Sequence, residues 1–192
     1  MKSAFRLASL ILLALPVAAS AHTGVGDTSG FLAGFGHPVG GADHLLAMVA
    51  VGMWAAQLGG RALWAIPGTF VVVMLAGGAL GIAGTPLPYV EQGILVSVLV
   101  LGMLISAATR VSLTAGALIV GVFAVFHGHA HGTEIPSATA ALAYSAGFAV
   151  ATALLHGTGI AFGVMLQKQN IERLVRLAGA AITVGGVYLA VG

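Results

Sequence analysis

Six long apolar stretches dominate the chain, and short polar or glycine-rich connections separate them. The stretches run over residues 39–58, 62–83, 89–108, 111–130, 138–166 and 171–191. Each is close to or above the ~20 residues that an α-helix needs to cross about 30 Å of hydrocarbon. Backbone groups find no partners in lipid, and the stretches lack the alternation of a barrel strand, so helix is the predicted structure. The pattern predicts an all-α polytopic membrane protein with a bundle of six transmembrane helices.

The first 21 residues form an apolar segment of a different kind. Lys2 and Arg6 open it, an apolar run over 7–17 follows, and Ala-Ser-Ala stands at 19–21. This order is typical of a secretory signal peptide, which we expect to be cleaved after Ala21. A short uncleaved anchor helix is the alternative. Cleavage would leave residues 22–192 as a single transmembrane domain that begins at His22, with its N-terminus outside.

Composition and charge exclude several classes of protein. Hydrophobic residues make up 59% of the chain, charged residues 6%, and the mean hydropathy is +1.07, which fits neither a soluble domain nor a disordered chain. Beyond residue 21 the chain has five basic and five acidic residues, so no excess of positive charge indicates a nucleic-acid partner. The absence of cysteine excludes disulfides and thiolate metal sites. Lys168, the one lysine beyond residue 21, lacks the glycine-rich surroundings of a phosphate-binding loop, so we expect no ATP hydrolysis.

The basic residues also predict an orientation. Lys and Arg concentrate in cytoplasmic loops of membrane proteins. In a six-helix topology all five basic residues beyond the signal segment fall on one side, namely Arg61, Arg110, Lys168, Arg173 and Arg176. That side is predicted to be cytoplasmic, which places both mature termini outside. The signal peptide leads to the same orientation.

Six of the seven histidines lie in or beside apolar stretches, and five of them form two motifs, HPVGGADH at 37–44 and FHGHAHGTE at 126–134. Ionisable residues at membrane depth are costly unless paired or wetted, so they are functional candidates. His127 and His131 are four residues apart and Glu134 follows three later, so a helix that continues to Ile135 would carry all three on one face. His129 points elsewhere, and we interpret it as an interhelical hydrogen-bonding residue; a place on the metal path is the alternative.

The first motif supplies the second half of a predicted metal site. Pro38 and the glycine pair at 40–41 predict a break in the helix, whereas Asp43 and His44 lie inside the first apolar stretch. In the predicted topology both motifs reach the outer leaflet. Imidazole and carboxylate without sulfur suit Ni²⁺, Co²⁺ or Zn²⁺ rather than Cu(I) or Ca²⁺. The predicted ligands are His37, Asp43, His44, His127, His131 and Glu134.

Two further histidines are weaker candidates. His156 lies deeper, in the fifth stretch, and is either a lower step of an ion path or a packed core residue. His22 would stand beside the free amine of the mature N-terminus, where the two groups together could capture a metal. Glycines four residues apart, including the pairs 77/81, 128/132 and 159/163, predict close helix packing.

The two motifs and the signal-led six-span layout resemble the HupE/UreJ family of secondary nickel/cobalt permeases, which are linked to hydrogenase and urease maturation. The resemblance covers essentially the whole mature chain in layout, and its specific motifs cover about 17 residues. The family's motif positions fall on His37, Pro38, Asp43, His44, Phe126, His127, Gly128, His131, Gly132 and Glu134, while His129 fills a variable position. The resemblance implies Ni²⁺ uptake from periplasm to cytoplasm across a bacterial inner membrane, with no permanently bound cofactor.

Two other functions remain open from the residues alone. An intramembrane zinc-dependent hydrolase would use the same side chains to activate water against a lipid substrate. A small membrane scaffold would carry the histidines incidentally. The choice between Ni²⁺ and Co²⁺ and the question of a homo-oligomer also stay open.

Overall fold

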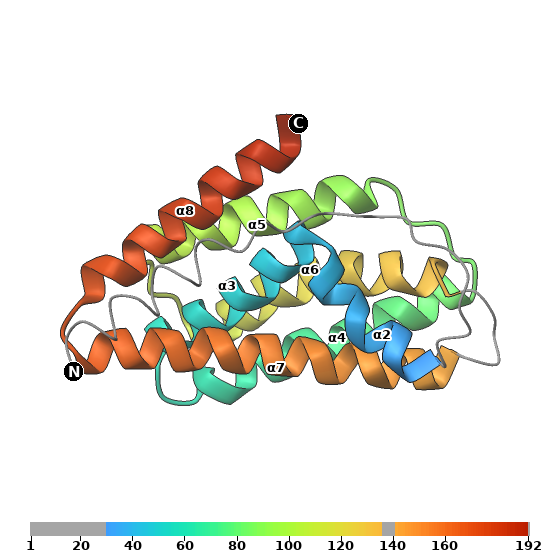
Figure 1. The fold of residues 1–192 in the computed structure, drawn as a ribbon, viewed down its shortest axis with the longest axis horizontal. Helices are drawn as coiled ribbons and strands as arrows, with labels where there is room; N and C mark the ends of the chain where they lie inside the picture. The colour runs from blue at the N-terminus through green and yellow to red at the C-terminus, as the bar shows by residue number, and fades with distance from the viewer. Residues whose placement is uncertain (1–29, 136–140, 192) are drawn as a thin grey trace.

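The computed structural model describes residues 30–135 and 141–191, and these residues form seven α-helices and no strand (Figure 1). The helices are α2 (Gly30–Gly40), α3 (Ala42–Leu58), α4 (Ala62–Ile82), α5 (Val90–Ser106), α6 (Leu113–Thr133), α7 (Ala141–Lys168) and α8 (Glu172–Val191). The predicted all-α class is confirmed for this part of the chain. The predicted signal peptide and His22 lie outside the described residues.

Each of the six predicted apolar stretches corresponds to one helix, although α6 and α7 run two or three residues beyond the predicted ends. By length and composition α4, α6, α7 and α8 are each able to cross a membrane, and α2 and α3 pass the same test only as a pair bent by 83°. Helix α5 is apolar but has 17 residues. Four spans, or five with the bent pair, therefore follow from the described helices, and the count of six stays a prediction.

The first stretch differs from the expected single helix over 39–58. Helix α3 begins at Ala42, and Gly41 before it is extended, with φ −100° and ψ 122°. Residues 30–40 form a separate helix, α2, whereas the first predicted span began only at residue 39. The predicted break near the glycine pair is thus confirmed. The prediction missed the helix before the break, because an eleven-residue glycine-rich segment gives little helical signal of its own.

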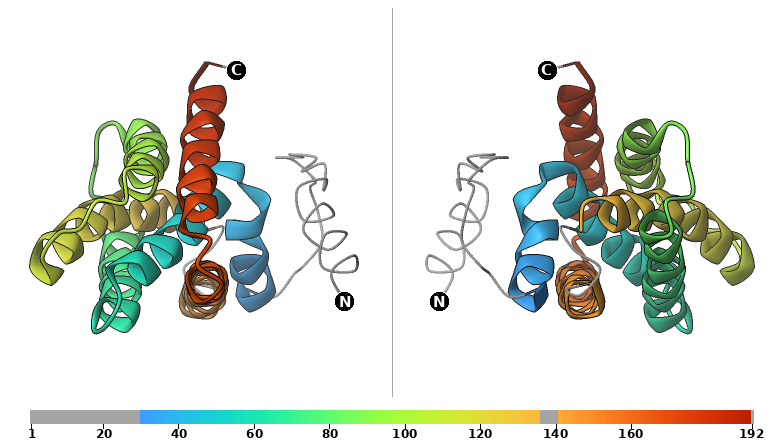
Figure 2. Two further views of the ribbon diagram at one scale, coloured as in Figure 1. Left: turned by 90° about the vertical axis from the view of Figure 1, so that its left-hand side faces the viewer. Right: turned by 90° about the vertical axis from the view of Figure 1, so that its right-hand side faces the viewer.

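Helix α3 lies at the centre of the bundle, between α5 and α7 (Figure 1). Ten of its 17 residues are buried. Around it α4 packs on α6, α7 packs on α2 and α3, and α5 pairs with α8. Figure 2 shows α7 nearly end-on with α2 beside it, while α8 rises away at a steep angle.

Several glycines permit these close contacts. A Cβ at Gly128 would overlap the Met74 carbonyl of α4, and one at Gly132 would overlap the Gly78 carbonyl. A Cβ at Gly52 of α3 would overlap the His156 carbonyl of α7. The packing role expected for the pair 128/132 thus fits the structure, whereas nothing lies within 4 Å of a Cβ at Gly36.

The two ends of the bundle differ in chemistry. The α3–α4, α5–α6 and α7–α8 connections, which carry or adjoin the basic residues, lie at one end (Figure 1, left). Side chains tie this end together: Gln57 Nε2 donates to the Ile105 carbonyl at 3.0 Å, and Arg176 Nε donates to the Ser106 carbonyl at 2.8 Å. The histidine motifs at the start of α3 and the end of α6 lie toward the opposite end.

Candidate metal centre

The structure brings the two histidine motifs into one cluster. The ring centroids of His37 and His131 are 4.5 Å apart, those of His44 and His131 4.5 Å, and those of His44 and His127 4.8 Å. Three helices supply these rings: α2 carries His37, α3 carries His44, and α6 carries the other two. The juxtaposition expected from their common depth is therefore present.

The break between α2 and α3 makes this arrangement possible. The 83° bend turns α2 so that His37 and His44 both face α6, with ring centroids 6.5 Å apart. A Cβ at Gly41 would lie 2.9 Å from Asp43 Oδ1 and 3.3 Å from His44 Nδ1. Glycine at the break thus leaves room for the carboxylate–imidazole pair.

At the outer edge of the cluster stands Glu134. Helix α6 ends at Thr133 rather than at Ile135, and Glu134 is its C-cap. The carboxylate still reaches the cluster, since Oε2 lies 3.0 Å from His37 Nε2 and 3.9 Å from His131 Nδ1. The hydrogen bond from His37 lowers the pKa of Glu134 below its ordinary value, although partial burial opposes the shift. Ligand atoms of these three residues all lie within 4.8 Å of one another, so together they could hold a metal ion.

Asp43 orients His44. Asp43 Oδ1 accepts hydrogen bonds from the His44 backbone N–H at 2.7 Å and from His44 Nδ1 at 2.8 Å. A carboxylate can only accept, so the ring proton is on Nδ1 and the lone pair is on Nε2. His44 Nε2 is buried without a hydrogen-bond partner. Asp43, predicted as a ligand, therefore contacts His44 and would act on an ion held there through that ring and through its charge.

Ser97 of α5 orients His127 and fixes its ring proton on Nε2, the opposite nitrogen to that in His44. The Ser97 hydroxyl donates to the Ile94 carbonyl at 2.6 Å, so its oxygen accepts from His127 Nε2 at 3.0 Å. This leaves the lone pair of His127 on Nδ1, which is buried and unpartnered.

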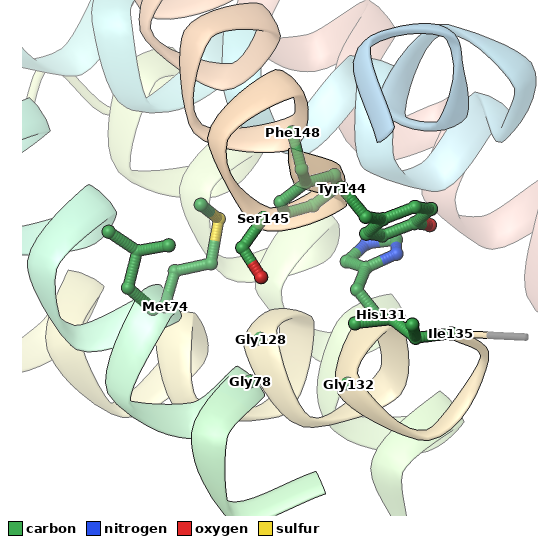
Figure 3. A pocket seen from close by; sticks show the side chains of 10 residues that line it. Met74, Gly78, Gly128, His131, Gly132, Ile135, Tyr144, Ser145 and Phe148 are labelled. Carbon is green, nitrogen blue, oxygen red and sulfur yellow. The ribbon is translucent and has the colours of Figure 1, made fainter. Parts of the chain in front are cut away.

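His131 has no hydrogen bond at either ring nitrogen, although its exposed fraction is only 3%. Its ring lies against Phe148 of α7, with centroids 3.8 Å apart. Figure 3 shows His131 pointing from α6 toward Tyr144 at one end of a small pocket. The pocket has a volume of about 20 Å³, which is space for about one water molecule. A divalent ion would have to lose most of its hydration shell to enter it.

The remaining histidines lie apart from this cluster. His129 Nε2 donates to the Thr85 carbonyl at 2.7 Å and so ties α6 to the α4–α5 connection, in keeping with the structural interpretation. His156 of α7 is buried and faces Phe70 of α4.

Comparison with known proteins identifies the family. The family model described as "HupE / UreJ protein" matches residues 10–189. The chain belongs to the HupE/UreJ family. It is similar to "Protein HupE" of Rhizobium leguminosarum bv. viciae, with 45% identity over 184 residues that cover 96% of each chain. No solved structure matches. The resemblance inferred from the two motifs is confirmed, and the HupE/UreJ proteins are hydrogenase and urease accessory proteins of the nickel/cobalt permease type.

Ser97 and Phe148, which also contact the cluster of this HupE/UreJ chain, were not predicted from the sequence. Ser97 carries the one hydroxyl in the middle of apolar α5. An isolated polar residue in an apolar helix indicates a polar partner inside the bundle, so the sequence could have identified this residue. The Phe148 ring lies against that of His131, but an aromatic residue in an apolar helix carries no signal that separates it from lipid-facing or core positions.

Proposed function

We propose that this HupE/UreJ protein is a secondary transporter that imports Ni²⁺ from the periplasm to the cytoplasm, with Co²⁺ as a second candidate cargo. The observation that carries the proposal is the set of unpartnered nitrogens on the buried rings of His44, His127 and His131. A buried polar group without a partner costs about 1–3 kcal/mol. Several such groups facing one another are best explained by a ligand that they share, and imidazole suits borderline divalent ions.

The cluster supports an ordered entry of the ion. The side chains of His37 and Glu134 are exposed by 38% and 53%, so they are accessible from the outer end and would meet the ion first. His44 and His127 lie further in and would replace the remaining water ligands by imidazole. The carboxylates of Asp43 and Glu134 offset the double positive charge of the cargo in a medium of low dielectric constant.

The rest of the molecule fits this direction of transport. We place the basic end of the bundle in the cytoplasm and the histidine cluster toward the periplasm, with six spans, a cleaved signal peptide and both mature termini periplasmic in the inner membrane. A potential that is negative inside favours inward movement of a divalent cation by roughly 4.6 kcal/mol per 100 mV. The imported metal would supply the maturation of a hydrogenase or a urease.

Uptake of radioactive Ni²⁺ and Co²⁺ into proteoliposomes tests the proposal. With an inside-negative potential, vesicles that contain the purified protein should accumulate metal faster than protein-free vesicles, and dissipation of the potential should slow the uptake. Equal accumulation in both kinds of vesicle would refute transport. Near-stoichiometric Zn²⁺ that stays with the purified protein would instead favour the hydrolase, since a transport site must release its ion.

A further inference from the structure

His156 is an imidazole that the outer cluster does not use. It lies on α7 with an exposed fraction of 1%, and neither ring nitrogen has a hydrogen-bond partner among the described residues. A neutral imidazole carries one donor and one acceptor, so both capacities are unsatisfied. His129, by comparison, is buried but anchored to the Thr85 carbonyl.

His156 is the next imidazole inward from the cluster. The Phe70 ring lies 5.5 Å from the His127 ring and 5.2 Å from the His156 ring, measured between centroids. A single aromatic side chain therefore contacts both the innermost ring of the cluster and His156. One turn outward on α7, Thr152 Oγ1 donates to Met74 Sδ at 3.7 Å, which places further polarisable atoms along the same face.

Gln57 of α3 is a second side chain with a buried, unpartnered polar atom, and it lies between His156 and the basic end of the bundle. Helix α3 meets the His156 backbone at Gly52, and Gln57 follows five residues later, about 7.5 Å further along the helix axis. Gln57 Oε1 is buried without a partner. The Gln57 side chain also lines a pocket of about 100 Å³ at the basic end, together with Arg110, Gln167, Glu172 and Arg176.

We infer that His156 is an inner binding site for the transported divalent cation, which the ion reaches past the Phe70 ring and leaves toward Gln57. The inference rests on the proposed transport function. One imidazole holds a borderline divalent ion more weakly than several imidazoles do, and passage requires sites from which the ion can depart. An inner site with a single imidazole meets this requirement.

A core histidine without a function predicts a different behaviour. Unpartnered nitrogens in a buried ring oppose folding, so an apolar side chain of similar size should stabilise the protein and leave its activity unchanged. An inner binding site predicts instead that the same substitution keeps or raises stability while transport is lost.

The test compares three variants of the full chain in detergent and in proteoliposomes: His156→Leu, His156→Gln, and His129→Gln as a matched control. For His156→Leu we expect the unfolding temperature to stay the same or to rise by roughly 2–4 °C. Equilibrium binding of Ni²⁺ at the outer cluster should stay within about twofold, while the initial rate of uptake falls about tenfold or more. His156→Gln, which keeps a polar group, should show the same loss of uptake, and His129→Gln should transport within about twofold of the wild type.

Each outcome bears on one claim. Uptake by either His156 variant within twofold of the wild type would overturn the inner site and leave the proposed transport intact. A loss of uptake that is matched by an equal loss of Ni²⁺ binding at the outer cluster would also overturn it, because His156 would then act on that cluster. Failure of the wild type to accumulate metal would refute the transport function, and the inner site with it.

Discussion

At the scale of single residues, the two central imidazoles are fixed in opposite tautomers by different partners. Asp43 holds the proton of His44 on Nδ1, and Ser97 holds the proton of His127 on Nε2. The free lone pairs are therefore on His44 Nε2 and His127 Nδ1. Outer partners of this kind orient metal ligands and raise their basicity. The orientation of the two imidazoles thus depends on Asp43 and Ser97, one residue from each of two helices.

Asp43→Asn tests the first of these partners. The amide keeps the shape of the side chain but removes the charge, and its NH₂ group can turn toward His44 and oppose the native tautomer. We expect the affinity for Ni²⁺ to fall about 10–100-fold, with a matching fall in uptake at limiting metal. Equilibrium Ni²⁺ binding by the purified variant measures the effect. Wild-type binding in this variant would show that the carboxylate has no part in the site.

Ser97→Ala tests the second partner. Loss of the hydroxyl frees His127 Nε2, so the ring can rotate or change tautomer, and we expect uptake to fall about tenfold or more. Ser106→Ala is the matched control, because Ser106 lies on the same helix and its carbonyl, rather than its hydroxyl, accepts the bond from Arg176. Equal uptake by the two variants would contradict the role assigned to Ser97.

Residue spacing predicted part of this site. The turn from His127 to His131 fixes both on one face of any helix, so their pairing followed from the sequence. The bond from His127 to Ser97 joins residues 30 positions apart on different helices, and no local pattern encodes it.

At the scale of elements, hydrophobic length determined most of the fold. The predicted stretch 62–83 corresponds to α4 over Ala62–Ile82, because the apolar run and its glycine-rich flanks mark both ends. Helix α2 was not predicted, because it is short and its position depends on its packing against α7. Direct contact between α4 and α6 follows from small residues whose partners could not be read from one sequence.

Gly128→Ala tests that contact. The new Cβ would overlap the Met74 carbonyl, so α4 and α6 must move apart, at a cost of about 1–3 kcal/mol. We expect a lower unfolding temperature in detergent and weaker uptake, since His127 and His131 would shift with α6. Gly36→Ala is the control because nothing lies within 4 Å of its Cβ position. A Gly128→Ala variant as stable as this control would contradict the packing argument.

At the scale of the whole molecule, the bundle is chemically asymmetric, with carboxylates and imidazoles toward one end and guanidinium groups toward the other. Protons compete with metal for imidazole, whose free pKa is about 6.5. The pKa of Glu134 lies below its ordinary value, because His37 donates a hydrogen bond to it, so this carboxylate stays ionised to a lower pH than a free glutamate. Uptake at limiting metal and clamped potential should therefore fall as the external pH is lowered from about 7.5 to about 5. A flat profile between about pH 5 and 7.5 would argue against histidine ligation.

The central claim is that the two histidine motifs act on one ion, and a double-mutant cycle tests it most directly. His44→Gln and His127→Gln each remove one imidazole from rings whose centroids are 4.8 Å apart, and each should lower the initial rate of Ni²⁺ uptake about 10–100-fold. Groups that act on one ion are not additive. The double variant should therefore stay within about threefold of the worse single variant, whereas a loss equal to the product of the two single losses would show that the motifs act independently.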